Sequence, residues 1–338
     1  MNRIRYLIRR ALHMDWGKML STARHLAPIA KRSVLWLMAD MFRCAIKYQA
    51  GYMDYKIAEF YRLTDAQRAT QITRGKSNAI VQRMNDKADW HFFDNKNEFN
   101  TLFAEYLHRD WFDLTSNDAA VSSALATWLK GRGDIIAKPM DGSSGQGIEK
   151  FTPDAFADPA AFESLLRKKN LTLLEDCVVQ HPVMSSLCPT SVNTMRIATL
   201  LSDKKQGVVY AYLRIGNGRV MDNVDCGGMA APIDLNTGKL SAVGADKAGR
   251  AFETHPLTGT RIPGFQIPFF QEAVDMCLKA MRVKPRVRFV AWDVAVTADS
   301  PLFIEGNSFP SHAIPQFAAH FPDGVGIMPR FGEFISLP

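Results

Sequence analysis

The chain has 338 residues, of which 47% are hydrophobic and 22% are charged, which is typical of a folded protein of about two domains. The net charge is +7, but the first fifty residues alone hold ten Lys and Arg against only Asp15 and Asp40, so the rest of the chain carries −1. A nearly neutral body argues against a protein that binds nucleic acid over its whole surface.

Cysteine usage and hydropathy favour a cytoplasmic protein. The five cysteines are widely spaced and form no CxxC pair, so neither a disulfide framework nor a zinc site is expected. No apolar run approaches the ~18 residues that a membrane-spanning helix needs, and the N-terminus lacks the apolar core and cleavage site of a signal peptide.

The chain changes its pattern about a third of the way along. In residues 1–90, apolar residues recur at spacings of three and four, as in helices. Short β-rich runs separated by turn residues begin at about 134. We expect strands at 134–138, 171–175, 194–201, 207–215, 287–296 and 302–305, and helices at 159–169 and 269–281. The pattern predicts an α+β body behind a helical N-terminal region at 1–90.

A lysine and a glycine-rich loop form the first candidate site. The apolar strand at 134–138 ends in Lys138, and the loop that follows holds Gly142, Ser143, Ser144, Gly145 and Gly147. Backbone N–H groups and hydroxyls of such a loop can approach phosphate oxygens, which the lysine neutralises. The lysine precedes the glycines, so this is not a P-loop. The alternative is a Gly/Ser hairpin with no ligand.

Three oxygen-bearing side chains form the second candidate site. Asp293 lies in one apolar strand, and Glu305 and Asn307 lie in the next one, after a tight turn. Residues two apart in a strand point to the same face, so Glu305 and Asn307 are expected together. Mg²⁺ prefers such oxygen ligands. The alternative is an edge strand with polar residues at its turn.

Two further segments carry polar residues in strands. Glu175 ends an apolar strand that leads into a partly polar crossover, which an ordinary strand end would also explain. Arg196 lies inside an otherwise apolar strand, where an arginine usually holds a carboxylate or a phosphate. A purely structural ion pair is the alternative.

These segments, in this order, resemble the ATP-grasp superfamily, and more narrowly the sugar-transfer-associated ATP-grasp family, which is related to alpha-L-glutamate ligases. The resemblance spans roughly residues 50–315. It rests on Asp54-Tyr55, Phe60-Tyr-Arg-Leu, Asp94-Asn-Lys96, Lys138-Pro and its loop, Glu175 to Pro182, Ser191-Val-Asn193-Thr-Met-Arg196, Gly227-Gly228, Asp234-Leu-Asn-Thr-Gly238, His255-Pro-Leu-Thr-Gly259, Trp292-Asp293 and Ile304-Glu-Gly-Asn307.

The resemblance implies an ATP-grasp fold, in which two α+β subdomains grip ATP, at about 91–177 and 178–338. It implies that Lys96 and Lys138 contact phosphates, and that Glu175 and the Val178 backbone meet adenine. Arg196 would face the transferred phosphoryl group. A flexible lid over the phosphates would include Ser143, Ser144 and Gly145. The loop near the second substrate would include Asn223, Gly227 and Gly228. One or two Mg²⁺ ions, or Mn²⁺, would be bound by Asp293, Glu305 and Asn307.

The expected activity is that of an ATP- and Mg-dependent carboxylate–amine ligase that works through an acyl phosphate. Its substrates would be small or sugar-linked molecules, in the modification of a cell-surface polysaccharide or a peptidyl precursor, with no nucleic-acid partner. Arg196, Lys138 and Asn307 are the candidate catalytic residues. Two alternatives stay open: an ATP-grasp phosphotransferase, and a nucleotide-binding scaffold at a membrane.

The basic segment and one histidine complete the sequence hypotheses. Residues 1–32 combine arginines with apolar residues at helical spacing, a pattern found more often in a helix packed on its own domain, and one that also fits peripheral contact with the inner face of an anionic membrane or with a glycan-assembly partner. His312, shortly after Asn307, is a candidate for the acceptor side. The sequence leaves the substrates and the oligomeric state open.

Overall fold

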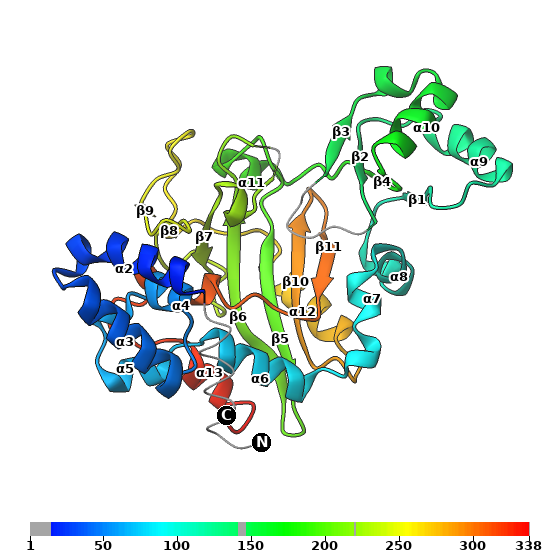
Figure 1. The fold of residues 1–338 in the computed structure, drawn as a ribbon. Coiled ribbons are helices and arrows are strands. Elements are labelled where there is room, and N and C mark those ends of the chain that lie inside the picture. The colour runs from blue at the N-terminus through cyan, green and yellow to red at the C-terminus, as the bar shows by residue number, and fades with distance from the viewer. Residues whose placement is uncertain (1–14, 141–146, 220, 338) are drawn as a thin grey trace. The chain divides into compact units, whose positions relative to one another are not determined.

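A computed structural model describes residues 15–140, 147–219 and 221–337 of the chain. The chain forms two compact units (Figure 1). Unit 1 consists of residues 1–83, 247–251 and 311–338, and unit 2 consists of residues 84–246 and 252–310.

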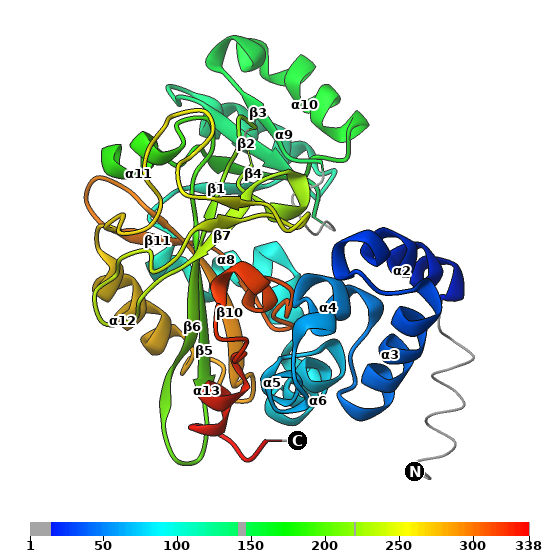
Figure 2. The ribbon, with the colours of Figure 1, turned by 90° about the vertical axis from the view of Figure 1, so that its left-hand side faces the viewer.

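Unit 1 is helical where it is described (Figure 2). Side chains just before the helices accept hydrogen bonds from the first turns: Asp15 from the Lys18 N–H at 2.9 Å and Ser33 from the Trp36 N–H at 3.2 Å. Such caps satisfy amide groups that the helix itself leaves unpaired. The α-helices of the unit are α2 (Trp16–Ala30), α3 (Val34–Lys47), α4 (Tyr52–Ile57), α5 (Asp65–Thr70), α6 (Arg74–Met84) and α13 (Met328–Gly332).

The inner faces of α2, α3 and α4 supply an apolar core that includes Leu26, Leu37 and Tyr55. A buried ion pair lies beside this core. Arg68 donates to both oxygens of Asp40, at 2.9 and 2.7 Å, and the Tyr55 hydroxyl donates to the same carboxylate at 2.8 Å. All three side chains are almost fully buried, so the charges are satisfied by each other rather than by water.

Unit 2 contains both β-sheets. The smaller sheet has the order β1-β4-β2-β3, all antiparallel, and one side of it packs on α9 and α10 through a core that includes Leu125, Phe162 and Leu174. Its elements are β1 (Trp111–Asp113), α9 (Ala119–Leu129), β2 (Ile135–Lys138), β3 (Glu149–Phe151), α10 (Pro159–Lys168) and β4 (Leu173–Asp176).

The larger sheet has the order β11-β10-β5-β6-β7-β8-β9. Its strands are β5 (Met195–Leu201), β6 (Gln206–Ile215), β7 (Met229–Pro232), β8 (Gly244–Ala245), β9 (Ala251–Phe252), β10 (Phe289–Val296) and β11 (Pro301–Asn307). The helices of this part of the chain are α7 (His91–Asp94), α8 (Lys96–Leu102), α11 (Pro182–Leu187) and α12 (Phe270–Ala280).

The two faces of the larger sheet differ because side chains alternate along each strand. One face carries Ile197, Trp292 and Phe303, which join the core formed with α7, α8, α11 and α12. Trp292 stacks on Phe303 with ring centroids 4.7 Å apart. The opposite positions of the same strands hold the charged side chains Arg196 and Asp293. The fold therefore presents a row of buried charges on one face of a sheet whose other face is apolar.

The expected α+β class and the helical N-terminal region are confirmed. Every strand and helix expected between 134 and 305 is present, with ends that differ by at most three residues. The short strands β1, β3, β8 and β9 and the strand β7 were not expected, since strands of two to four residues leave almost no periodic signal. Within the described residues, no helix is both long enough and apolar enough to span a membrane.

Candidate active site

Lys138 and Glu175 meet on the smaller sheet. Lys138 is the last residue of β2, and β4, which carries Glu175, pairs with β2. The Lys138 Nζ lies 2.5 Å from Glu175 Oε2. Arg109, just before β1, donates to the same carboxylate at 3.2 and 3.3 Å, and Asn100 in α8 donates to it at 3.1 Å. The four side chains form one polar cluster, which we call the lysine cluster.

The lysine cluster keeps Glu175 ionised. Burial raises the pKa of this carboxyl, but the charges of Arg109 and Lys138 outweigh burial and hold the pKa well below its usual value. Arg109 also donates to the backbone carbonyls of Phe303 and Ile304 in β11. Glu175 therefore fixes the position of Lys138, and Arg109 ties the cluster to the edge strand of the larger sheet.

Lys96 also lies near the end of β2. It is the first residue of α8, whose N-cap Asn95 accepts from the N–H groups of Asn97 and Glu98. The Lys96 Nζ donates to the carbonyl of Met140, two residues after Lys138, at 3.0 Å. The two lysines that the resemblance assigns to phosphates thus lie near the same strand end. The expected lid residues Ser143, Ser144 and Gly145 lie outside the described residues.

Asp293 is the centre of a second cluster, on the charged face of the larger sheet. It is fully buried in β10. Arg196 in the neighbouring β5 donates to both of its oxygens, from Nε at 2.8 Å and from Nη2 at 2.7 Å. Arg214 in β6 reaches the same carboxylate, with Nη2 2.9 Å from Oδ2. We call Arg196, Arg214, Asp293, Glu305 and Asn307 the acid cluster.

The carboxyls of the acid cluster have opposite pKa shifts. Burial raises the pKa of Asp293, but Arg196 and Arg214 reverse that effect and lower it to about 2. Burial raises the pKa of Glu305, and the nearby charge of Asp293, to which it is hydrogen-bonded, raises it further. Asp293 is therefore the permanent anion, whereas Glu305 holds a proton more readily than an ordinary glutamate.

A hydrogen-bonded chain supports Arg214 from behind. Its Nε and Nη2 donate to the Thr194 hydroxyl at 2.9 and 2.7 Å. The Thr194 hydroxyl and N–H both donate to Asp222, at 2.5 and 2.8 Å. Burial raises the pKa of Asp222, although Arg214 and Thr194 oppose the shift. The chain fixes the guanidinium of Arg214 against Asp293.

The donor set of the acid cluster fits a hard divalent cation. Asp293 pairs with Glu305 across β10 and β11, and the Asn307 amide lies 3.5 Å from Glu305 Oε1, so the three side chains share a face. Two adjacent carboxyls are a site whose charge repulsion a cation would relieve. Among the described residues, no group of three or more His, Cys, Asp or Glu is arranged to hold a metal, so a cation here would need a ligand of another type beside the two carboxyls, such as the amide oxygen of Asn307.

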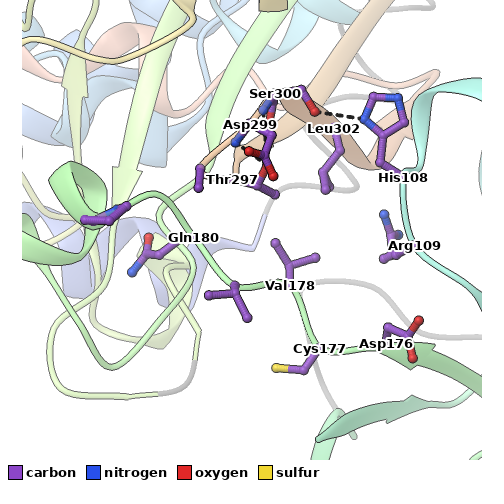
Figure 3. Close-up of a pocket in the computed structure, with 13 residues that line it drawn as sticks. His108, Arg109, Asp176, Cys177, Val178, Gln180, Thr297, Asp299, Ser300 and Leu302 are labelled. Atoms are coloured by element: carbon purple, nitrogen blue, oxygen red, sulfur yellow. Dashed lines mark hydrogen bonds between the residues drawn. The ribbon is translucent and has the colours of Figure 1, made fainter. Parts of the chain in front are cut away.

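A pocket of about 470 Å³ lies beside the linker that follows β4 (Figure 3). The linker residues Cys177, Val178 and Gln180 line one side of it. The turn between β10 and β11 lines another side, where the Ser300 hydroxyl lies 3.1 Å from His108 Nδ1. Of the residues predicted to meet the nucleotide, the pocket includes Val178 but neither Lys138 nor Glu175. Arg109, a member of the lysine cluster, also lines the pocket, so the pocket borders this cluster without including Lys138 or Glu175.

The acceptor-side candidates fall in different units. His312 belongs to unit 1, where its Nε2 lies 3.1 Å from Oδ1 of the buried Asp54. Asn223, Gly227 and Gly228 belong to unit 2, in the loop that contains Asp222. The loop therefore connects directly to the chain of hydrogen bonds behind Arg214.

Sequence reasoning missed Arg109, Arg214 and Asp222. Arg214 carried a usable signal, because it lies in an apolar strand in the same way as Arg196. Arg109 carried none, since it lies in a short polar segment before a strand of three residues. Asp222 becomes a candidate only when its contact with Thr194, 28 residues away in the chain, is known.

A lysine cluster on a small antiparallel sheet, with an acid cluster on the charged face of a larger one, is the arrangement expected of an ATP-grasp protein. The chain belongs to the sugar-transfer associated ATP-grasp family, whose sequence profile matches residues 159–331, just over half of the chain. The resemblance predicted from the motifs is confirmed.

Solved structures with a similar fold share little sequence with this chain. The D-alanine–D-alanine ligase from Helicobacter pylori has a TM-score of 0.44 at 11% identity, over 78% of this chain and 70% of that one. The D-alanine–D-alanine ligase from Coxiella burnetii has a TM-score of 0.41 at 12% identity, over 77% and 68%. A D-cycloserine synthetase has a TM-score of 0.43 at 11% identity, over 83% and 93%. No curated protein matches the sequence.

Proposed function

We propose that the protein is an ATP-dependent carboxylate–amine ligase that acts in the modification of a cell-surface polysaccharide or a peptidyl precursor. The observation that carries the proposal is the acid cluster, in which two buried arginines and three oxygen-bearing side chains share one face of a sheet. Positive charge and oxygen ligands at one place suit the phosphates of a nucleotide and the cation that accompanies them.

Glu305, Asn307 and Asp293 are the proposed ligands of Mg²⁺, for which Mn²⁺ can substitute. When bound, this cation would neutralise negative charge on the phosphates of the nucleotide. Arg196 and Arg214 already occupy both oxygens of Asp293. We therefore assign Glu305 and Asn307 as the main ligands, with Asp293 contributing a remaining lone pair and orienting the two arginines.

The nucleotide phosphates are assigned to Lys138 and Lys96, together with the loop at Ser143, Ser144 and Gly145. Glu175 positions Lys138 and does not contact the phosphates, because its carboxylate already accepts from Lys138, Arg109 and Asn100. Adenine is assigned to the backbone at Val178. In the proposed division into subdomains at about 91–177 and 178–338, behind residues 1–90, Lys96, Lys138 and the loop belong to the first subdomain and Val178 begins the second.

The protein's own part in the reaction is positioning and charge neutralisation. A carboxylate oxygen of the first substrate attacks the γ-phosphorus of ATP, and ADP leaves. The amine of the second substrate then attacks the acyl carbon and loses a proton. Phosphate leaves and carries with it one oxygen of the original carboxylate. Arg196 faces the phosphoryl group as it transfers, Arg214 holds Asp293 in place, and Asn307 is assigned to the catalytic set.

The test is to supply the purified protein with Mg·ATP and panels of acids and amines, and to follow ADP release. A ligase gives ADP release that requires both an acid and an amine, and ¹⁸O from a labelled carboxylate appears in the released phosphate. Phosphate retained on a hydroxyl substrate would identify a phosphotransferase instead. Binding of Mg·ATP without turnover on any panel would favour a nucleotide-binding scaffold at a membrane, in contact through residues 1–32.

A further inference from the structure

Helix α3 of unit 1 is apolar on two faces. Its inner face, with Leu37, Met41 and Cys44, is buried in the core of the unit. Its outer face carries Leu35, 80% exposed, and Phe42 and Ile46, which are 40% and 38% exposed. At ~100° per residue these three side chains lie within about 40° of one another around the helix. They form one exposed stripe, which the packing of unit 1 does not explain.

Exposed apolar side chains are concentrated in this part of the chain. Of the fifteen large hydrophobic residues that are exposed among the described residues, seven lie between residues 16 and 53. They are Trp16, Ile29, Leu35, Trp36, Phe42, Ile46 and Met53. Single exposed hydrophobic residues are common on protein surfaces, whereas a gathered set marks a surface that meets something else.

A basic row lies beside the apolar stripe. Trp36, Arg43 and Lys47 lie about 100° around the helix from the stripe. Arg32, just before the helix, places its guanidinium 5.0 Å from the ring centroid of Trp36. Arg43 and Lys47 share Asp65, at 2.6 and 2.7 Å, so this pair keeps a net positive charge.

The exposed charge of α2 and α3 has one sign. Between residues 16 and 47 there are six Lys and Arg and a single acid, Asp40. Asp40 is buried, both of its oxygens accept from Arg68, and the exposed Arg43 lies 3.9 Å from one of them, so the cations still outnumber the acid on this surface. Trp, Arg and Lys beside aliphatic side chains, with Asp65 outnumbered by the cations around it, match the interface of an anionic bilayer, where apolar groups enter the acyl region and cations meet headgroups.

We propose that the outer face of α3 docks the protein on an anionic phospholipid bilayer, with Leu35, Phe42 and Ile46 inserted at the interface and Arg32, Arg43 and Lys47 against the headgroups. This goes beyond the proposed ligase activity and is independent of it. No spanning helix is needed for such contact, because an amphipathic surface that lies on the bilayer is sufficient.

The test is co-sedimentation of the full chain with vesicles. We expect binding to vesicles that contain phosphatidylglycerol, little binding to phosphatidylcholine alone, and weakening by salt. The variant L35S/F42S/I46S should lose affinity at least about tenfold, because each side chain removed contributes apolar area. The matched control L165S/L257S/V283S removes three exposed hydrophobic residues of unit 2 and should bind as the wild type does.

A second variant separates charge from apolar contact. R32Q/R43Q/K47Q should lower binding to phosphatidylglycerol vesicles and reduce its dependence on salt. If the triple serine variant fails to fold, as judged by circular dichroism, L35S alone serves, since that side chain is 80% exposed and contributes little to the core.

Five results would overturn the proposal. The first three are no binding by the wild type, equal binding to neutral vesicles, and equal loss of binding in the control variant. The fourth is a change from oligomer to monomer in the stripe variant by light scattering, which would assign the face to a second copy of the chain. Substitution of the arginines at 3, 5, 9 and 10 by glutamine tests whether the first residues carry the binding instead. If that variant loses binding while the stripe variant keeps it, the proposal fails as well.

Discussion

Charge pairing explains why single residues of the site tolerate such deep burial. Asp293 is fully buried yet ionised, because Arg196 and Arg214 supply the compensation that water would otherwise give. Glu305 lies beside it with the opposite shift in pKa. The two neighbouring carboxyls can therefore be distinguished by experiment. The charge of Asp293 holds two arginines, whereas burial disfavours the charge of Glu305.

Asp293→Asn and Glu305→Gln should have different effects on stability. Loss of the Asp293 charge leaves two buried guanidinium groups unpaired, so the free energy of unfolding should fall by about 3–5 kcal/mol. Burial and Asp293 disfavour the charge of Glu305, so its loss in the glutamine variant should cost less, within about 1 kcal/mol of the wild type. Urea denaturation measures both. An equal loss of stability would show that the charges of the two carboxyls are equally important to the fold.

Both variants should lose at least about a hundredfold in ATP turnover, because each removes an oxygen ligand or the anchor of two arginines. Steady-state ADP release measures the loss. Ordinary turnover by a folded Asp293→Asn variant would contradict the assignment of the acid cluster.

The lowered pKa of Glu175 leads us to expect that the stability of the fold depends on pH. The pKa of this carboxyl is lowered in the folded protein, so the stabilisation is present above the unfolded value of 4.5 and is lost as the pH falls below it. Glu175→Gln should therefore be less stable than the wild type by about 3 kcal/mol at neutral pH, with a difference that narrows in acid. Thermal melting of both proteins from about pH 7 to about pH 3 tests this. A difference that does not change with pH would contradict it.

At the scale of an element, the loop after β6 is shaped by backbone crowding. A Cβ atom on Gly228 would lie 2.4 Å from the Asp222 carbonyl oxygen and 2.8 Å from that of Ile215. Gly227, before it, has φ +95°, which only glycine adopts easily. The same loop contains Asp222, whose carboxylate accepts from Thr194 behind Arg214. The glycine pair thus connects a tight turn to the acid cluster.

Gly228→Ala should displace this loop. Because the clash is with backbone atoms, we expect a loss of about 1–3 kcal/mol in stability and a lower kcat. Gly249→Ala is a matched control outside the site. Its φ is +86°, but nothing lies within 4 Å of the added Cβ, so it adds backbone strain without crowding. Equal effects of the two variants on kcat would show that the loop after β6 does not support the site.

At the scale of the molecule, each unit has its own core and its own buried ion pair. In unit 1, Arg68 and Asp40 pair beneath Tyr55. In unit 2, the acid cluster lies against a sheet whose other face is apolar. The division expected from the sequence, with a boundary near residue 90 and subdomains that meet near 177, stays a prediction.

Asp40→Asn should weaken unit 1 by about 3–5 kcal/mol, because Arg68 is 4% exposed and would lose its counter-charge. Hydrogen exchange should then rise in α2, α3 and α5, and change little in β5 and β10. The conservative surface change Asp65→Asn, at an exposed ion pair, is the control and should cost less than about 1 kcal/mol. A uniform rise in exchange across both units would contradict independent local stability.

The sequence by itself predicted the longer strands and helices between 134 and 305, because alternation and turn residues are local signals. It missed the strands β3, β7, β8 and β9 and the helix α11, all of six residues or fewer. The sequence also determined the family, and it marked Lys138, Arg196, Asp293, Glu305 and Asn307 as residue types unusual in apolar strands. These features depend on a few neighbouring residues, so they can be read along the chain.

Only the tertiary structure decided which charges meet. Arg109 reaches Glu175 across 66 residues of chain, and Arg196 reaches Asp293 across 97. Arg214 reaches the same acid from β6, although β5 lies between β6 and β10 in the sheet, an order that no local signal along the chain shows. Strand order and register decide which side chain pairs with a buried charge, and both arise from the packing of the whole sheet.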